Sequence, residues 1–464
     1  MNATMMALSI SGFMICLGMI IRTKSKTLGK LLIPVNVIAG ILGLIYMNTI
    51  NNFLTPLITE NEFNSIVNQM FTFSFISIGL ASVSDKKEKI EKNSGGSTIT
   101  KGSFGMGLQW SLLFGLTAVI GVLVIYVIGG LFGMDPMYGI LIPYAFCQGP
   151  GQAAVMGEIF EEFYGMQNAQ MVGITFAVTG FISAFAIGVP IAKYGLRKKL
   201  QVSNASISET VERGFYYPEE QQESMGKVTT HSGNLETLSF HVALMGICYI
   251  IAVILGELCY YIPEIGPAFG NMLFIWGMVG GSIVKKVLAK LDVEYLLNKP
   301  LQNKITGFTS DFLVVCAFMA IKVSTVLEWI IPIIIVSIVI AILTAVVCFY
   351  FTSRLGSDHD FERSLGMYGM CTGTTPTGIA LVRIVDPKLQ TATATELGMT
   401  NLFMMTVTPV TLAVTFLGAG TIELSSALLI ILCCCVVYLA ILKICKFCNK
   451  PTFNLIKGEK YPIK

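Results

Sequence analysis

Apolar runs of about 20 residues recur along the whole chain, separated by short charged loops. Runs of this length span the hydrocarbon core of a bilayer, which is about 30 Å thick. Charged residues make up 13% of the chain, whereas a soluble domain holds about 25%. The pattern therefore predicts an all-α polytopic membrane protein.

The apolar runs divide into continuous spans and two broken segments. The broken segments, 137–163 and 364–387, are shorter and are interrupted by Gly, Pro and polar residues. The predicted continuous spans lie at 4–21, 31–47, 66–84, 107–132, 169–193, 238–262, 268–284, 306–322, 328–352, 391–417 and 421–442.

Lys and Arg give the orientation, because loops rich in these residues stay in the cytoplasm. Suppose that the N-terminus lies outside and that each broken segment returns to the side from which it enters. The cytoplasmic stretches then hold all but Lys322 of the 31 basic residues. A full crossing by either segment would place later basic clusters outside. The charges therefore predict two re-entrant hairpins, an N-terminus outside and a cytoplasmic C-terminus.

The same map predicts two inverted repeats of five spans, each with one hairpin. The first repeat is 1–194, a cytoplasmic linker is 195–236, and the second repeat is 237–418. Residues 419–464 add one C-terminal helix and a cytoplasmic tail. The first break, CQGPGQAA (147–154), parallels CTGTTPTGIA (371–380) in the second half. Inverted repeats with interrupted helices are typical of secondary transporters.

The two breaks are the candidate binding site. Interrupted backbone at membrane depth persists only where protein buries it or water reaches it. The free N–H groups at the start of a half-helix suit a carboxylate, and free C=O groups with nearby hydroxyls suit Na⁺. Pro150 and Gly151 are expected to end the first half-helix of hairpin one. The predicted substrate-binding residues are Gln148, Gly149, Gly151, Gln152, Thr374, Thr375, Thr377 and Arg383.

Four oxygen-bearing residues are predicted ligands of the coupling ion, Na⁺: Thr372, Thr375, Asp311 and Asn401. Each prediction has a structural alternative. Asp311 could instead cap the N-terminus of its helix, and Arg383 could reach the cytoplasmic surface and pair with Asp386. Either Gly/Pro cluster could simply kink a membrane helix.

At these residues the chain resembles the bacterial sodium:glutamate symporters, the ESS family. GMDPMYGIL (133–141) resembles the entry to the family's first re-entrant segment, and NAQMVGITFAVTGFISAFAIGVPIAKYGLRKK (168–199) resembles the span that follows it. GTTPTGIA (373–380) resembles the family's Gly-x-Thr-Pro-Thr-x-Ile-Ala second tip. The resemblance implies an elevator-type secondary transporter, a homodimer in the bacterial cytoplasmic membrane that takes up glutamate with Na⁺.

Three features depart from the family pattern. The family's first tip is typically Ser-Gly-Gly-His-Gly-Thr-Gly, whereas residues 147–153 contain no His and carry a proline. The second half-helix after the Thr-Pro tip carries Arg383, and the last span with CCC (433–435) is additional. The predicted substrate is therefore glutamate or a related small carboxylate.

Several alternatives remain open from the sequence. A carrier of citrate or another dicarboxylate would use the same architecture, and a membrane-embedded enzyme or a channel is a more distant alternative. Cys445 and Cys448 are either two free thiols or a redox or metal pair. The expected partners are the lipid bilayer, the carboxylate and a second copy of the chain, with no nucleic acid.

The orientation gives a first prediction. In a background without the native cysteines, a cysteine placed within 201–235 will resist a membrane-impermeant maleimide in intact cells, because this linker belongs to the cytoplasmic basic set. The same residue will be labelled once the membrane is permeabilised. Labelling of intact cells at the permeabilised rate would reverse the topology.

Overall fold

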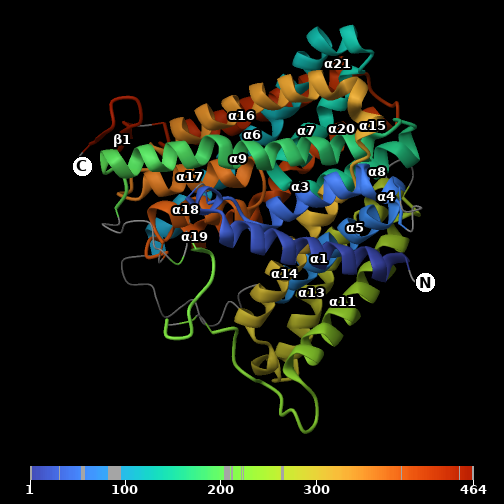
Figure 1. Ribbon diagram of the computed structural model, residues 1–464. Helices are drawn as coiled ribbons and strands as arrows, with labels where there is room; N and C mark the ends of the chain where they lie inside the picture. The colour runs from blue at the N-terminus through green and yellow to red at the C-terminus, as the bar shows by residue number, and fades with distance from the viewer. Residues whose placement is uncertain are drawn as a thin grey trace. The chain divides into compact units, whose positions relative to one another are not determined.

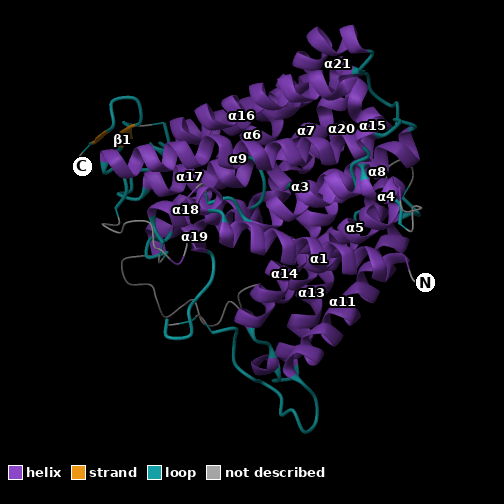
Figure 2. Cartoon of the chain, in the orientation of Figure 1, coloured by secondary structure: helices purple, strands orange, loops and turns teal. Residues whose placement is uncertain are grey.

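The computed structural model describes residues 3–30, 32–53, 58–81, 96–202, 210, 213–220, 222, 224–262, 266–387, 389–448 and 450–461. The described chain is helical almost throughout, with two short strands near the C-terminus (Figure 2). It divides into two compact units, each assembled from separate stretches of sequence. Residues 85–95 of the predicted basic stretch 85–101 and part of the linker 195–236 lie outside the described residues.

Unit 1 comprises Met1–Gly18, Ile38–Ile90 and Tyr216–Ala320. It holds most of α1 (Ala3–Lys24) and of α3 (Val35–Asn48), together with α4 (Ile50–Phe53), α5 (Glu60–Ala81), α11 (Thr237–Cys259), α12 (Gly266–Asn271), α13 (Leu273–Lys290), η3 (Glu294–Leu296) and α14 (Lys299–Met319).

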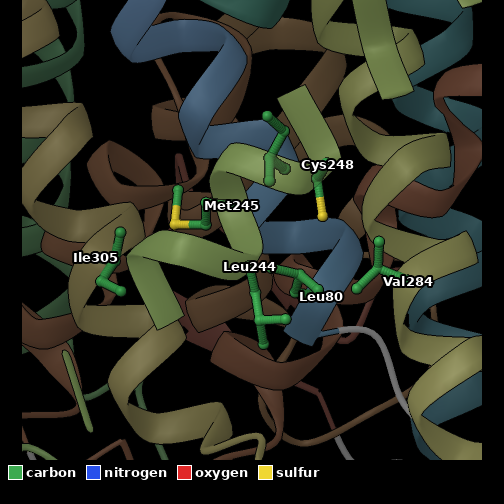
Figure 3. Packing of buried hydrophobic residues seen from close by; sticks show 7 residues of the cluster. Leu80, Leu244, Met245, Cys248, Val284 and Ile305 are labelled. Carbon is green, nitrogen blue, oxygen red and sulfur yellow. The ribbon is translucent and has the colours of Figure 1, made fainter. Parts of the chain in front are cut away.

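The core of unit 1 is an apolar cluster built from four helices. Figure 3 shows side chains of α5, α11, α13 and α14 converging on one another. The buried members are Ile76, Leu80, Leu244, Met245, Cys248, Val284 and Ile305.

Glycines let two of these helices touch backbone to backbone. A Cβ on Gly79 of α5 would lie 2.5 Å from the carbonyl oxygen of Met278, and one on Gly281 of α13 would lie 2.8 Å from that of Ile76. Small residues at helix crossings allow this close packing in membranes.

Unit 2 comprises Met19–Val37, Glu91–Phe215 and Ile321–Lys464. Its elements are α2 (Lys26–Lys30), α6 (Gly96–Ile128), η1 (Gly129–Phe132), η2 (Pro136–Leu141), α7 (Ile142–Gln148), α8 (Pro150–Tyr164), α9 (Ala169–Lys198), α15 (Val323–Val326), η4 (Leu327–Trp329), α16 (Ile330–Thr352), α17 (Asp360–Cys371), α18 (Thr375–Val385), α19 (Thr393–Thr400), η5 (Asn401–Val407), α20 (Thr408–Gly418), α21 (Leu424–Ile444), β1 (Phe453–Asn454) and β2 (Glu459–Lys460).

Helix α9 is the central element of unit 2. It contacts α7, α8, α16, α17 and α18, and Figure 1 shows it in green alongside α17. Four glycines recur about every two turns along it: Gly173, Gly180, Gly188 and Gly195. Because an α-helix has 3.6 residues per turn, this spacing places all four on one side of α9, which we call the glycine face.

The helices bear out the prediction of a polytopic membrane protein. Within the described ranges, six helices are long and apolar enough to cross a bilayer: Ala3–Lys24, Thr100–Phe132, Ala169–Lys198, Thr237–Cys259, Val323–Thr352 and Leu424–Ile444. The other predicted spans coincide with α3, α5, α13, α14 and the stretch α19–η5–α20, which are shorter or more polar.

Two predicted spans are not continuous helices, and 268–284 is interrupted at Met272, between α12 and α13. Residues 391–417 form α19, the 3-10 turn η5 and α20 in succession. Pro409 lies in the first turn of α20. A missing N–H is tolerated there, whereas in the middle of a helix it would interrupt the hydrogen-bond ladder. The sequence predicts one span over 391–417 and does not reveal this break, because the apolar composition conceals it.

The contact between α5 and α13 yields a stability prediction. Gly281→Ala will lower the free energy of unfolding by about 1–3 kcal/mol, the usual effect of overpacking, because the new Cβ meets backbone atoms that cannot rotate away. The matched control is Gly246→Ala on α11, where no atom lies within 4 Å of the Cβ position. Thermal unfolding in detergent measures the stability of both variants. Equal melting temperatures of the two variants would show that α5 and α13 can move apart without loss of stability.

Candidate functional site

The first broken segment consists of η2, α7 and α8. Its break is the single residue Gly149, which has φ 85° and ψ −177°. A side chain at such a positive φ is strained, so the position favours glycine. Pro150 is the first residue of α8, where a missing N–H is tolerated. The expectation that Pro150 and Gly151 end the first half-helix was therefore wrong, because both begin the second.

This segment runs along α9 and turns back at its tip. Near its start, the Tyr138 hydroxyl donates a hydrogen bond to the carbonyl oxygen of Gln167, directly before α9 (2.5 Å). Near its end, a Cβ on Gly157 would lie 2.3 Å from the Cα of Gln170. Both ends of the segment therefore lie at the N-terminal end of α9.

The second broken segment, α17 and α18, approaches α9 from its other end. Phe361, at the start of α17, lies against Gly195, and Leu381 of α18 lies against Gly188. The two half-helices pack tightly on each other, since a Cβ on Gly369 would lie 2.8 Å from the Cα of Gly378. Both ends of this segment therefore lie toward the C-terminal end of α9.

The tips of the two segments meet at the middle of α9. A Cβ on Gly149 would lie 2.6 Å from Cγ2 of Thr374 and 3.0 Å from the carbonyl oxygen of Gly373. A Cβ on Gly180 of α9 would lie 2.7 Å from the carbonyl oxygen of Thr372. The structure thus brings together the two breaks that the sequence predicts as one site.

Each tip presents the N-terminus of a helix. Gly149 precedes α8 and Thr374 precedes α18, and neither of these two described N-cap residues makes a side-chain capping bond. The first N–H groups of a helix have no acceptor within it, and this end carries a partial positive charge. Two such ends beside each other form a setting suited to an anion.

Two glutamines of the first tip carry unused acceptors. Gln152 is 3% exposed. The Oε1 atoms of Gln152 and Gln148 are buried, and within the described part of the chain they have no hydrogen-bond partner. A buried polar atom without a partner is destabilising by about 1–3 kcal/mol. The first tip therefore holds two amide oxygens that could accept hydrogen bonds from a ligand.

Hydroxyl groups line the second tip. The Thr374 and Thr377 hydroxyl oxygens lie 3.1 Å apart, and the Thr375 hydroxyl lies 3.3 Å from Oδ1 of Asn401 in η5. The Thr372 hydroxyl donates to the carbonyl oxygen of Tyr368 (2.7 Å) within α17. Two predicted Na⁺ ligands, Thr375 and Asn401, are therefore in contact.

The chemistry of these donors fits Na⁺. Hydroxyl, amide and carbonyl oxygens are ligands of small hard cations, and the second tip carries all three kinds. Across the described ranges, no three His, Cys, Asp or Glu side chains gather in a way that could hold a metal ion.

The other two predicted residues are not part of either tip. Asp311 is an exposed residue within α14 of unit 1. It does not cap that helix, because the side chain of Asn298 accepts the capping bond from the N–H of Leu301 (3.0 Å). Arg383 lies in the last turn of α18, about 12 Å along the helix from Thr375. The buried carboxylate of Asp386 accepts bonds from the backbone N–H groups of Gln390 and Thr391 and from the Thr391 hydroxyl.

Sequence analysis missed two contributors to the tip contact. Trp110 of α6 donates its indole N–H to the carbonyl oxygen of Cys147 (3.0 Å), a carbonyl left free where α7 ends. Gly180 of α9 leaves room for the second tip. The regular glycine spacing in α9 was the available signal for Gly180, whereas nothing in the sequence links Trp110 to Cys147.

Sequence analysis also missed an ion cluster at the base of the second segment. Arg363 of α17 donates from Nε and Nη2 to the Glu396 carboxylate of α19 and from Nη1 to Asp360 (2.9 Å). All three side chains are at most 1% exposed. The sequence signal for this cluster was Glu396, a single acidic residue within an apolar run. An acidic residue in such a run usually pairs with a basic residue.

Comparison with known proteins shows the family to which the chain belongs. The sequence model of the sodium/glutamate symporter family matches residues 2–390. The sodium/glutamate symporter of Escherichia coli (strain K12) is 23% identical over 286 residues, which cover 58% of this chain and 68% of that protein. The sodium/glutamate symporter of Haemophilus influenzae is 25% identical over 261 residues, which cover 55% and 61%. The chain therefore belongs to the sodium/glutamate symporter family, a family of transporters rather than enzymes.

Proposed function

We propose that this protein is a Na⁺-coupled secondary active transporter that takes up glutamate or a related small carboxylate by alternating access. The observation that carries the proposal is the meeting of two uncapped helix N-termini where Gly149 contacts Thr374. Interrupted helices whose N-terminal ends point at an anionic substrate are the usual binding device of such carriers. Membership of the symporter family supplies Na⁺ as the coupling ion.

The two broken segments are proposed to be re-entrant hairpins that enter from opposite sides of the membrane. The first has both ends at the N-terminal end of α9, and the second has both ends toward its C-terminal end. An inverted repeat agrees with this arrangement. Unit 1 takes the first three predicted spans of each half, and unit 2 takes the last two spans with the broken segment of each half.

The substrate carboxylate is proposed to bind at the N-termini of α8 and α18. The N–H groups of Gly151, Gln152 and Thr377 belong to the first turns of these helices, where no intrahelical acceptor is available. The side chains of Gln148 and Gln152 add neutral hydrogen bonds in the first tip, where the symporter family typically carries a histidine. Arg383 remains a proposed contact for a second carboxylate.

The Na⁺ ion is proposed to bind beside the substrate, on the hydroxyl side of the second tip. Thr375 and Asn401 already lie within hydrogen-bond distance of each other, so a cation between them would draw on oxygens that are preassembled. Thr372 and Asp311 remain proposed ligands. Sodium bound here would lower the repulsion between the substrate carboxylate and the exposed C=O groups of the tip.

Both tips belong to unit 2, so one compact body could carry all of the proposed site residues except Asp311. This supports an elevator-type mechanism, in which unit 2 moves with its bound substrate. We also propose a homodimer in the bacterial cytoplasmic membrane, with the N-terminus outside and the linker 195–236 and the C-terminal tail in the cytoplasm.

Transport in proteoliposomes tests the function. With an inward Na⁺ gradient, the purified protein will accumulate labelled glutamate or another member of a panel of amino acids and dicarboxylates, because the site offers anion donors beside cation ligands. Replacing Na⁺ by choline will abolish accumulation. Preference for citrate would move the assignment to a dicarboxylate carrier. Accumulation of the substrate above its external concentration without any ion gradient would exclude symport.

The tip contact gives a second functional prediction. Gly149→Ala will weaken substrate binding at least tenfold, which corresponds to about 1.4 kcal/mol, because the Cβ would separate the two tips. The control for an alanine at positive φ is Gly165→Ala, whose φ of 68° and ψ of 19° lie in the left-handed helical region and whose Cβ would meet no atom within 4 Å. Equal substrate affinities in the two variants would show that the tips need not touch.

A further inference from the structure

The C-terminal tail packs against the base of the second hairpin. After α21, residues 450–461 form the short antiparallel pair β1–β2, with Phe453 opposite Lys460. Figure 1 shows β1 next to the marked C-terminus. The tail lies beyond residue 390, where the match to the symporter family ends. It is therefore an element whose role the family does not supply.

Thr452 holds this tail in place through its backbone N–H and its hydroxyl, whose single proton has two acceptors within reach. Its backbone N–H donates to the carbonyl oxygen of Ser353 (2.7 Å) at the end of α16. Its hydroxyl lies 3.0 Å from that same oxygen and 2.9 Å from Oδ2 of Asp360. Asp360 is fully buried and is the first residue of α17. The tail thus contacts the residue from which the second hairpin starts.

Asp360 links Thr452 to the other residues at the base of the second hairpin through further hydrogen bonds. Its Oδ2 also accepts the backbone N–H groups of Gly356 and Ser357, and its Oδ1 accepts from Arg363. Arg363 in turn binds Glu396 of α19 with both Nε and Nη2. Removal of a partner from a buried charged network is strongly destabilising, because the remaining charge has no compensation.

An aromatic contact reinforces the polar one. Phe453 of the tail is 3% exposed and packs edge-on against Phe361, with ring centroids 5.5 Å apart. Phe361 fits against Gly195, the last position of the glycine face of α9. The Lys460 ammonium group donates to the carbonyl oxygen of Gln201, just after α9 (3.0 Å).

We propose that the C-terminal tail positions the second tip, acting through the Thr452 hydroxyl on Asp360 and Arg363. Helix α17 is a rigid link of 12 residues between this base and the tip at Thr372, so a shift of Asp360 displaces the tip from Gly149 and Gly180. Thr452 and Asp360 are positioning residues that do not touch the substrate. The consequence for transport rests on the proposed function, whereas the positioning itself does not.

Amide hydrogen exchange on the full-length protein in detergent tests the positioning without reference to transport. Thr452→Val keeps the side-chain shape but removes the hydroxyl. We expect exchange in residues 360–378 to rise about tenfold, with α8 and α20 unchanged, because exchange reports local opening. Thr452→Ser, which restores the hydroxyl, will return exchange to the wild-type rate. The control is Ile456→Ser, a change at a tail side chain that is 92% exposed.

Sodium-driven glutamate uptake by the same variants tests the consequence. Thr452→Val will raise the KM for glutamate severalfold with less effect on kcat, and Thr452→Ser will reverse the change. Wild-type exchange in Thr452→Val would overturn the proposal. Faster exchange with an unchanged KM would overturn the link from tail to tip. Wild-type protein that takes up no substrate would refute the proposed function, and the exchange result would still decide the positioning.

Discussion

Close backbone approach along one side of α9 is the constraint on which the candidate site depends. A broken helix exposes donors and acceptors that lipid cannot satisfy, so each break must lie against other protein or reach water. The glycine face of α9 provides that surface, because the backbone of Ala153 and Thr372 reaches Gly173 and Gly180 without an intervening side chain. The two breaks therefore share one support, and neither tip would be stable alone in a bilayer.

The sequence was sufficient to locate both breaks, because Gly and Pro interrupt apolar runs in only a few physically permitted ways. It could not identify Gly149 as the break, since Pro150 is compatible with either the end or the start of a helix. The break at η5 escaped for a related reason: residues 401–407 are mostly apolar, and apolar composition does not distinguish a 3-10 turn from a helix.

Contacts between distant segments were the other limit. Arg363 and Glu396 are 33 residues apart, and the basic member lay in a stretch assigned to the cytoplasm by charge counting. Charge counting treats each Arg as solvated. It therefore cannot recognise an Arg that is buried and paired with two carboxylates. The contact of Thr452 with Asp360 spans 92 residues and involves a hydroxyl, which leaves no distinctive pattern in the sequence.

Gly149 combines two demands that usually fall on different residues. Its dihedral angles exclude ordinary side chains, and its neighbour Thr374 occupies the space where a Cβ would be. Every substitution at Gly149 is therefore subject to both backbone strain and the clash with Thr374, so none is neutral. Drift in the first tip must instead proceed through its flanking positions, and Gln148 and Gln152, the proposed substrate contacts, can change there without loss of the contact between the tips.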